Sequence, residues 1–213
     1  MTFAGIPLAA LDFYEDLEAD NSKAFWTAHR QVYDESVRAP LEALAELLSR
    51  EFGSAKLFRP YRDVRFAKDK SPYKTEQGVA FHDRALYLSV SAAGLLLACG
   101  YWQTAPDQVE RLRRAVADDV AGAELERAIS AVTRAGFSIG GEQITRVPSG
   151  YPKDHPRADL LRHKSLVAHR GFGAPAWLTS ARAASEVAKA FRRVAPLTDW
   201  LHTHVGPSNA PVR

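Results

Sequence analysis

The 213-residue chain is 46% hydrophobic and 25% charged, an ordinary globular composition that excludes a disordered or fibrous protein. Its single cysteine, Cys99, excludes a disulfide framework and a cysteine-rich zinc site, and it is typical of a reducing compartment. The length fits one domain, so we expect a single domain over residues 1–213, with its core at about 8–205 and frayed termini.

The sequence predicts a cytoplasmic protein without a membrane partner. The N-terminal segment has no basic region of the kind that opens a secretory signal. Residues 85–106 carry no charge and are long enough to span a membrane. Leu86, Leu88 and Val90 alternate with less apolar residues, however, which is the period of a strand. A buried β-hairpin is therefore the favoured interpretation.

Apolar spacing predicts the remaining elements in chain order. The first helices are expected over 7–17 and 22–52, with a break at Pro40, followed by strands between 56 and 98. Next come helices over 104–116 and 121–135, a tight hairpin through Gly140-Gly141, a short helical piece at 160–161, a strand over 166–172, and two helices between 174 and 205 that separate at Pro196. Helices at both ends of a run of strands predict an α+β fold with a largely antiparallel sheet.

Positive charge is concentrated in two segments. Residues 56–74 hold seven Lys or Arg and two Asp, and residues 146–170 hold six Lys or Arg, two Asp and three His. Because the whole chain carries only +3, the rest of it is net negative. This distribution indicates an anionic partner more strongly than the overall charge does, and a solvated basic surface is the alternative.

The first segment contains RPYRDVRFAKDKSPYK, residues 59–74. On a strand, Val64 and Phe66 would face the core while Asp63 and Arg65 project from the other face. Arg62 would then reach a rim or pair with a carboxylate. Arginine grips phosphate or carboxylate with two parallel bonds, and lysine adds a mobile charge, so the segment suits an anion.

Three motifs resemble a known family. RDVRFAKDKSPYK is similar to the signature of an uncharacterised bacterial and fungal family, domain of unknown function 2461, and GYPKDHPRADLLRHKS (residues 150–165) is a second match. A third is Asn21 followed by Phe25-Trp26 and Tyr33, where the family usually reads Trp-Phe. The matches run from about residue 10 to about residue 170. The resemblance implies a cytosolic α+β protein and brings no established activity, substrate or catalytic residue.

The two long motifs coincide with the two maxima of positive charge, which suggests one shared site. We expect a cleft that binds an anionic small molecule, with a phosphorylated one favoured, and with Asp63 and Asp154 orienting basic side chains. The expected ligand-binding residues are Arg62, Asp63, Arg65, Lys70, Tyr73, Lys74, Lys153, Asp154, His155 and Lys164. If a reaction occurs, His155 is the natural acid or base. The competing interpretation is a salt-bridge lattice that pins loop to sheet.

Other chemistry finds little support in the sequence. The chain has no P-loop, GxSxG elbow, HExxH motif or dinucleotide-binding glycine pattern, so no cofactor is expected. His202 and His204 lack a matching carboxylate or cysteine, so no metal is expected. Cys99 follows an apolar run and is expected to pack rather than react.

Two other classes of function stay open. A single-stranded nucleic-acid-binding module would use aromatic residues that interleave with the basic ones as stacking platforms, namely Phe58, Tyr61, Phe66, Tyr73 and Tyr151. A structural or adaptor domain would dock a partner on the amphipathic C-terminal helices. The sequence sets neither the oligomeric state nor whether the protein is an enzyme.

Overall fold

The computed structural model describes residues 2–65 and 68–209, and these divide into two compact units. Unit 1 covers the described residues up to Leu97 together with Gly171–Lys189. Unit 2 covers Ala98–Arg170 and the described residues from Ala190 onward. Each unit is described by itself.

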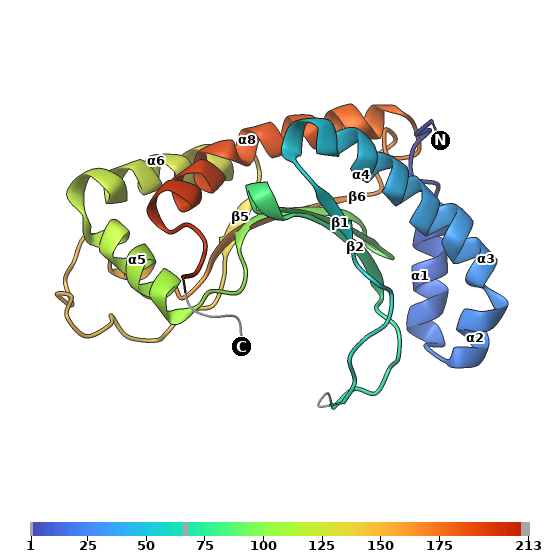
Figure 1. Cartoon of the computed structure of the whole chain (residues 1–213), viewed down its shortest axis with the longest axis horizontal. Coiled ribbons are helices and arrows are strands. Elements are labelled where there is room, and N and C mark those ends of the chain that lie inside the picture. Colours follow the sequence, from blue (N-terminus) through green and yellow to red (C-terminus); the bar gives the residue numbers. More distant parts are fainter. Residues whose placement is uncertain (1, 66–67, 210–213) are drawn as a thin grey trace. The chain divides into compact units, whose positions relative to one another are not determined.

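Unit 1 begins with helices and continues with strands (Figure 1). Its elements are α1 (Ala9–Ala19), α2 (Lys23–Ala28), α3 (Arg30–Val32), the π-helix η1 (Tyr33–Arg38), α4 (Ala39–Phe52), β1 (Ala55–Leu57), β2 (Glu76–Phe81), the 3₁₀-helix η2 (His82–Arg84) and β3 (Leu86–Ser91). β4 (Gly94–Tyr101), β6 (Leu166–Gly173) and α8 (Arg182–His204) contribute residues to both units.

Unit 2 is mostly helical. Its own elements are α5 (Pro106–Ala117), α6 (Asp119–Arg134), β5 (Ser138–Gly140) and α7 (Ala158–Leu161).

The strands of the chain form an antiparallel sheet in the order β1-β2-β3-β4-β6-β5. The α+β prediction with a largely antiparallel sheet is therefore confirmed.

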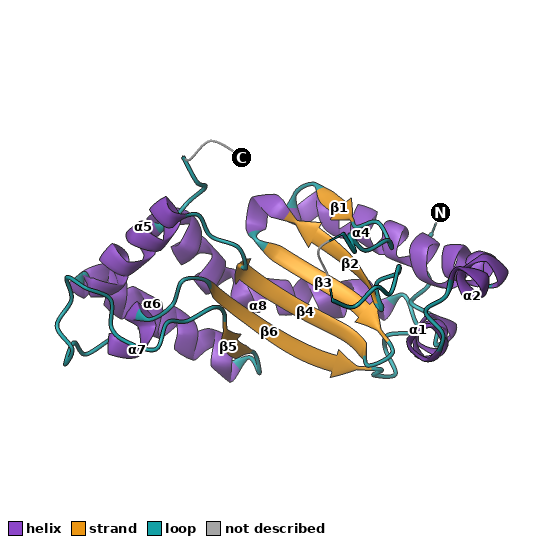
Figure 2. Ribbon diagram, turned by 90° about the horizontal axis from the view of Figure 1, so that it is seen from below, coloured by secondary structure: helices purple, strands orange, loops and turns teal. Residues whose placement is uncertain are grey.

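The strands of unit 1 separate a packed face from an open one. Val79 pairs with Leu88, and both side chains are fully buried beneath helices, because α4 packs on β1 and β2 and α1 packs on β3. The alternate residues, such as Lys56 and Glu76, point the other way. Figure 2 shows β1, β2 and β3 with no helix in front of them. On this open face Lys56 and Glu76 are exposed, whereas Ala80 and Ser89 are buried.

The uncharged run from 85 to 106 forms the predicted strands. β3 and β4 are neighbours in the sheet and are joined through a turn at Ala92-Ala93. Within the described residues, no helix is both long and apolar enough to span a membrane.

Three local predictions are wrong. Pro40 does not break the helix, because it lies in the first turn of α4, where its missing N–H costs nothing, and η1 leads directly into it. Pro196 lies inside α8, where buried neighbours such as Val194 and Leu197 hold the helix together. Gly140-Gly141 makes no tight hairpin, because β5 pairs with β6 instead.

A glycine at the start of β4 generates the first prediction. Gly94 has a φ of +92°, and a Cβ there would lie 2.2 Å from the carbonyl oxygen of Gly173. We expect Gly94→Ala to destabilise the protein by at least about 2 kcal/mol in denaturant unfolding, since strain and overlap add. Gly171→Ala is the matched control in unit 1, because a Cβ there meets nothing within 4 Å. Equal stability of the two variants would contradict the packing described.

Candidate functional site

The first family motif lies in a long connection between β1 and β2, residues 58–75, which we call the basic loop. The prediction of a strand here is wrong for residues 59–65: among the described residues of the loop, a single isolated bridge forms, between Tyr61 and Tyr73. The Asp63 carboxylate accepts a 3.2 Å bond from the Arg65 backbone N–H, and this local turn competes with an extended chain. Phe66 lies outside the described residues.

Three of the predicted cations form hydrogen bonds or ion pairs with other groups of the basic loop. Arg65 donates to both oxygens of Asp63, at 2.9 and 2.6 Å, and this hydrogen bonding lowers the pKa of Asp63. Arg62 pairs with Asp69, and the Lys70 ammonium donates to the carbonyl of Val64 at 3.0 Å. The pairs are exposed, so each stabilises the fold only slightly and serves mainly to shape the loop.

A clamp holds the end of the basic loop against the N-terminal helices. The Asn21 side chain accepts from the backbone N–H of Tyr73 at 3.0 Å and donates to its carbonyl at 3.1 Å. The Tyr73 ring stacks on Trp26, with centroids 4.3 Å apart and planes 8° apart, and both rings are almost fully buried. The clamp thus joins the third family motif to the first, and it positions the residue that follows, Lys74.

A second set of bonds ties the same helices to the start of the loop. The Tyr33 hydroxyl donates to the Gln77 side chain at 2.7 Å, and Gln77 donates in turn to the carbonyl of Phe58 at 2.6 Å. Gln77 is only 1% exposed, so these are buried bonds whose loss would leave polar atoms unsatisfied. Both ends of the basic loop are therefore fixed to unit 1.

Cations with no carboxylate partner gather where the two ends of the loop meet. The ammonium groups of Lys56 and Lys74 lie 6.0 and 5.2 Å from the centre of the Phe58 ring. Arg59 is exposed and has no hydrogen-bond or ion-pair partner among the described residues. Burial lowers the pKa of Lys74, and the charge of Arg59 lowers it further. Like charges are thus held close together here.

The cation cluster (Lys56, Arg59 and Lys74) lies beside residues of the open face of the sheet. Glu76 supplies one negative charge, and its carboxylate accepts from the Tyr87 hydroxyl at 3.0 Å. The Tyr87 ring crosses Gly78, where a Cβ would lie 2.4 Å from the hydroxyl oxygen, so the glycine makes room for the ring. The charge of Arg59 also acts on the Asp63 carboxylate, but Asp63 is already paired with Arg65, so the cluster stays net positive.

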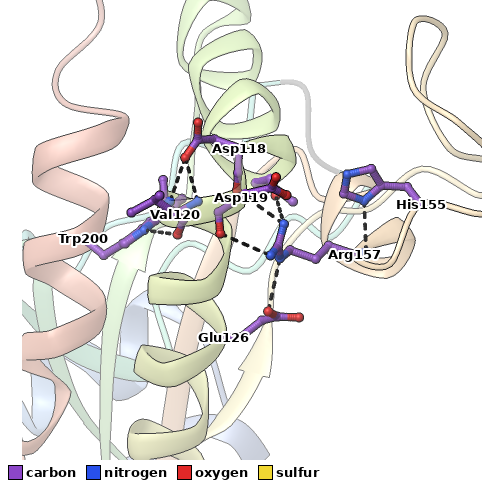
Figure 3. Close-up of polar contacts among 9 residues, drawn as sticks. Asp118, Asp119, Val120, Glu126, His155, Arg157 and Trp200 are labelled. Atoms are coloured by element: carbon purple, nitrogen blue, oxygen red, sulfur yellow. Dashed lines mark hydrogen bonds and ion pairs between the residues drawn. The ribbon is translucent and has the colours of Figure 1, made fainter.

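The second family motif lies in unit 2, where its central arginine is bound to the protein itself (Figure 3). Arg157 donates to the carbonyls of Val116 and Asp118, each at 3.3 Å, and to the Glu126 carboxylate at 3.1 Å. Its side chain is only 11% exposed. Val116 lies in the last turn of α5, where helix geometry leaves carbonyl oxygens unpaired and partly negative. Asp118 caps the start of α6, and its carbonyl also accepts from the Gly122 N–H at 2.9 Å. The guanidinium therefore braces the junction of the two helices.

The predicted ligand-binding residues of this motif differ in their surroundings. The His155 ring accepts from the Arg157 backbone N–H through Nδ1 at 3.0 Å, so a neutral ring carries its proton on Nε2 and is a donor there. Lys164 pairs with Glu142. Lys153 and Asp154 are exposed, and within the described part of the chain neither has a hydrogen-bond or ion-pair partner.

A buried histidine completes the lattice of unit 2. His163 contacts the Gln143 side chain at 2.7 Å and the Ser165 carbonyl at 3.0 Å, and burial lowers its pKa. The carbonyl requires a donor, so Nδ1 carries the proton and Nε2 accepts from Gln143. A neutral His163 ring with both nitrogens in hydrogen bonds has a structural role and is not available as a base.

Metal and thiol chemistry find no site in the described residues, among which no three His, Cys, Asp or Glu side chains are grouped to hold an ion. Cys99 is 2% exposed, and burial raises the pKa of its thiol to about 12, as expected of a packed cysteine.

Comparison with protein families matches residues 9–200 to the family described as conserved hypothetical protein DUF2461. The chain belongs to this family. No curated protein matches the chain. The family resemblance of the three motifs is thereby confirmed, and the match covers nearly all of both units.

The ten predicted ligand-binding residues divide between the units. Unit 1 holds Arg62, Asp63, Arg65, Lys70, Tyr73 and Lys74, and unit 2 holds Lys153, Asp154, His155 and Lys164. A single cleft formed by both motifs stays a prediction. Sequence reasoning passed over Lys56 and Arg59, although both lie in the basic segment, because the return of the loop brings Lys74 back to Phe58 and Pro60.

The clamp generates the second prediction. Asn21→Ala removes two bonds to the Tyr73 backbone, so we expect a loss of about 1–3 kcal/mol in unfolding free energy and faster hydrogen exchange at the Tyr73 amide. Ser22→Ala is the control, because it removes only the N-cap of α2, a 3.1 Å bond to Phe25. If Ser22→Ala exposed the Tyr73 amide as much as Asn21→Ala, the clamp would be refuted.

The lattice of unit 2 generates the third prediction. Arg157→Lys keeps the charge but cannot reach acceptors on several sides, so we expect a loss of about 1.5–3 kcal/mol. Lys153→Met, in the same motif, should change stability by less than about 0.5 kcal/mol. Chemical denaturation measures the unfolding free energy of both variants. An Arg157→Lys variant as stable as the unchanged protein would mean that the motif does not act as a structural lattice.

Proposed function

We propose that the protein binds an anionic small molecule carrying a phosphate group, and that the cation cluster of unit 1 holds this phosphate. The observation that supports the proposal is that Lys56 and Lys74 lie against the Phe58 ring and that the charge of Arg59 acts on Lys74, while none of the three forms an ion pair among the described residues. Each of these side chains donates hydrogen bonds to phosphate oxygens, and together they match the charge of a phosphate dianion.

The arrangement of the basic loop supports this assignment of roles. Three cations in the middle of the loop, Arg62, Arg65 and Lys70, bond to groups of the loop itself and stabilise its shape. The clamp at Tyr73 and the Gln77 bond to Phe58 hold the two ends of the loop together. Binding a phosphate therefore requires little ordering of the protein, which favours affinity.

The position of Lys74 also favours a ligand over a purely structural role. A lysine that is partly buried beside another cation costs stability, because burial and repulsion both disfavour its charge. The nearby carboxylate of Glu76 offsets this cost only in part. Such a cost is characteristic of functional sites, where a bound anion removes it.

The fourth prediction follows from this cost. Lys74→Met should weaken binding of a phosphorylated ligand about tenfold or more, because a charged hydrogen bond contributes about 1.5–3 kcal/mol. The same substitution should leave the melting temperature of the free protein unchanged or higher, since a repelled charge is removed. The control is Arg84→Gln, an exposed cation of η2 in unit 1, which should change neither quantity.

Thermal-shift titrations with glycerol 3-phosphate, ribose 5-phosphate and AMP provide the measurement, with glycerol, ribose and adenosine as unphosphorylated partners. A ligand at a hundredfold its Kd stabilises the folded protein by about 2.7 kcal/mol, which a melting curve resolves. Stabilisation only by the phosphorylated members, lost in Lys74→Met, is the expected result. Equal responses within each pair, or none, would refute the phosphate site.

One observation favours a second candidate, a single-stranded nucleic-acid-binding module. Tyr61 is 45% exposed on the basic loop, and its ring lies 6.0 Å from Trp26 and 5.5 Å from Tyr73. An exposed aromatic beside cations can stack a base. Oligonucleotide binding that falls steeply with salt, and that is lost in Tyr61→Leu, would favour this candidate over a small ligand.

A further inference from the structure

Unit 2 contains a groove that the function proposed above does not use. The groove lies between α6 and α8, which run side by side in Figure 1, and its volume is about 390 Å³. Small-ligand sites commonly measure about 300–1,000 Å³, so the groove can hold a small molecule. It is broadly open to solvent, as a site for a freely exchanging ligand would be.

The floor of the groove is apolar and fixed. Trp200 is 5% exposed, and its indole N–H donates to the carbonyl of Ala121 at 2.8 Å, which locks the ring onto α6. Ala128 and Pro196 complete the apolar lining. A rigid aromatic floor with a satisfied polar end suits an apolar ligand group.

The rim carries opposite charges that are not paired with each other. Arg127 on α6 and Asp199 on α8 both line the groove and are exposed, and neither has a hydrogen-bond or ion-pair partner among the described residues. The other acid of the rim, Glu124, lies 3.5 Å from Nε2 of His204. One cation and one anion therefore remain available on facing helices.

This combination selects a class of ligand. A simple anion would be attracted by Arg127 and repelled by Asp199, and a simple cation the reverse, so each gains one contact and suffers one repulsion. A zwitterion satisfies both charges at once. We propose that the groove binds a free α-amino acid with an apolar side chain: Arg127 takes the carboxylate, Asp199 takes the ammonium group, and the side chain lies over Trp200.

The proposal is tested with L-leucine, L-phenylalanine and L-methionine on the full chain, by calorimetry and by nitrogen NMR of the Trp200 indole group. We expect saturable binding at concentrations up to about 10 mM. N-acetyl-leucine lacks the ammonium group and leucinamide lacks the carboxylate, so each should bind at least tenfold more weakly than leucine. Binding of either analogue as tight as leucine, or no binding of the three amino acids, would overturn the proposal.

Variants assign the two charges. Arg127→Gln should weaken leucine at least tenfold while leaving leucinamide unchanged, and Asp199→Asn should weaken leucine while leaving N-acetyl-leucine unchanged. Arg134→Gln, an exposed cation in the last turn of α6 that does not line the groove, is the matched control. The melting temperature reports on folding in each variant. Loss of leucine binding in the control equal to that in Arg127→Gln would also overturn the proposal.

Discussion

The pair of hydrogen bonds between Asn21 and the Tyr73 backbone is the constraint on which the candidate site depends. One short amide satisfies both polar groups of a residue whose ring is buried against Trp26. A buried peptide group without partners is costly, so these bonds fix where the returning arm of the basic loop lies. The next residue, Lys74, is thereby held beside Phe58 and Arg59 in spite of the repulsion between the cations.

The two basic motifs of the family use the same kinds of residue for different physical ends. In unit 2, the Arg157 side chain is only 11% exposed, donates to carbonyls where α5 meets α6 and pairs with Glu126, so its charge is satisfied by the protein itself. In unit 1, the inner arginines are paired within the loop, whereas the cations at its base lack carboxylate partners. Local charge density therefore identifies both segments equally, and only the hydrogen-bond partners separate a lattice from a candidate binding site.

Much of the fold was predictable because it depends on local periodicity. The alternation of Leu86, Leu88 and Val90 identified β3, and helical spacing identified α5 and α6. The errors occurred where long-range contacts decide: Pro196 stays helical because buried neighbours hold α8, and the Asp63 side chain bends a segment that has the pattern of a strand. Of the site, Lys74 was predicted, but its neighbours depend on the way the loop returns to Phe58 and Pro60.

The pKa of the Lys74 ammonium group, followed by carbon NMR of its side chain, tests the central claim most directly. In the free protein, burial and the neighbouring Arg59 should hold this pKa below the ordinary value for lysine. Saturation with ribose 5-phosphate should raise it, because a phosphate dianion favours the charged form, while ribose should leave it unchanged. A pKa that does not respond to the phosphorylated sugar would contradict an anion site at the base of the basic loop.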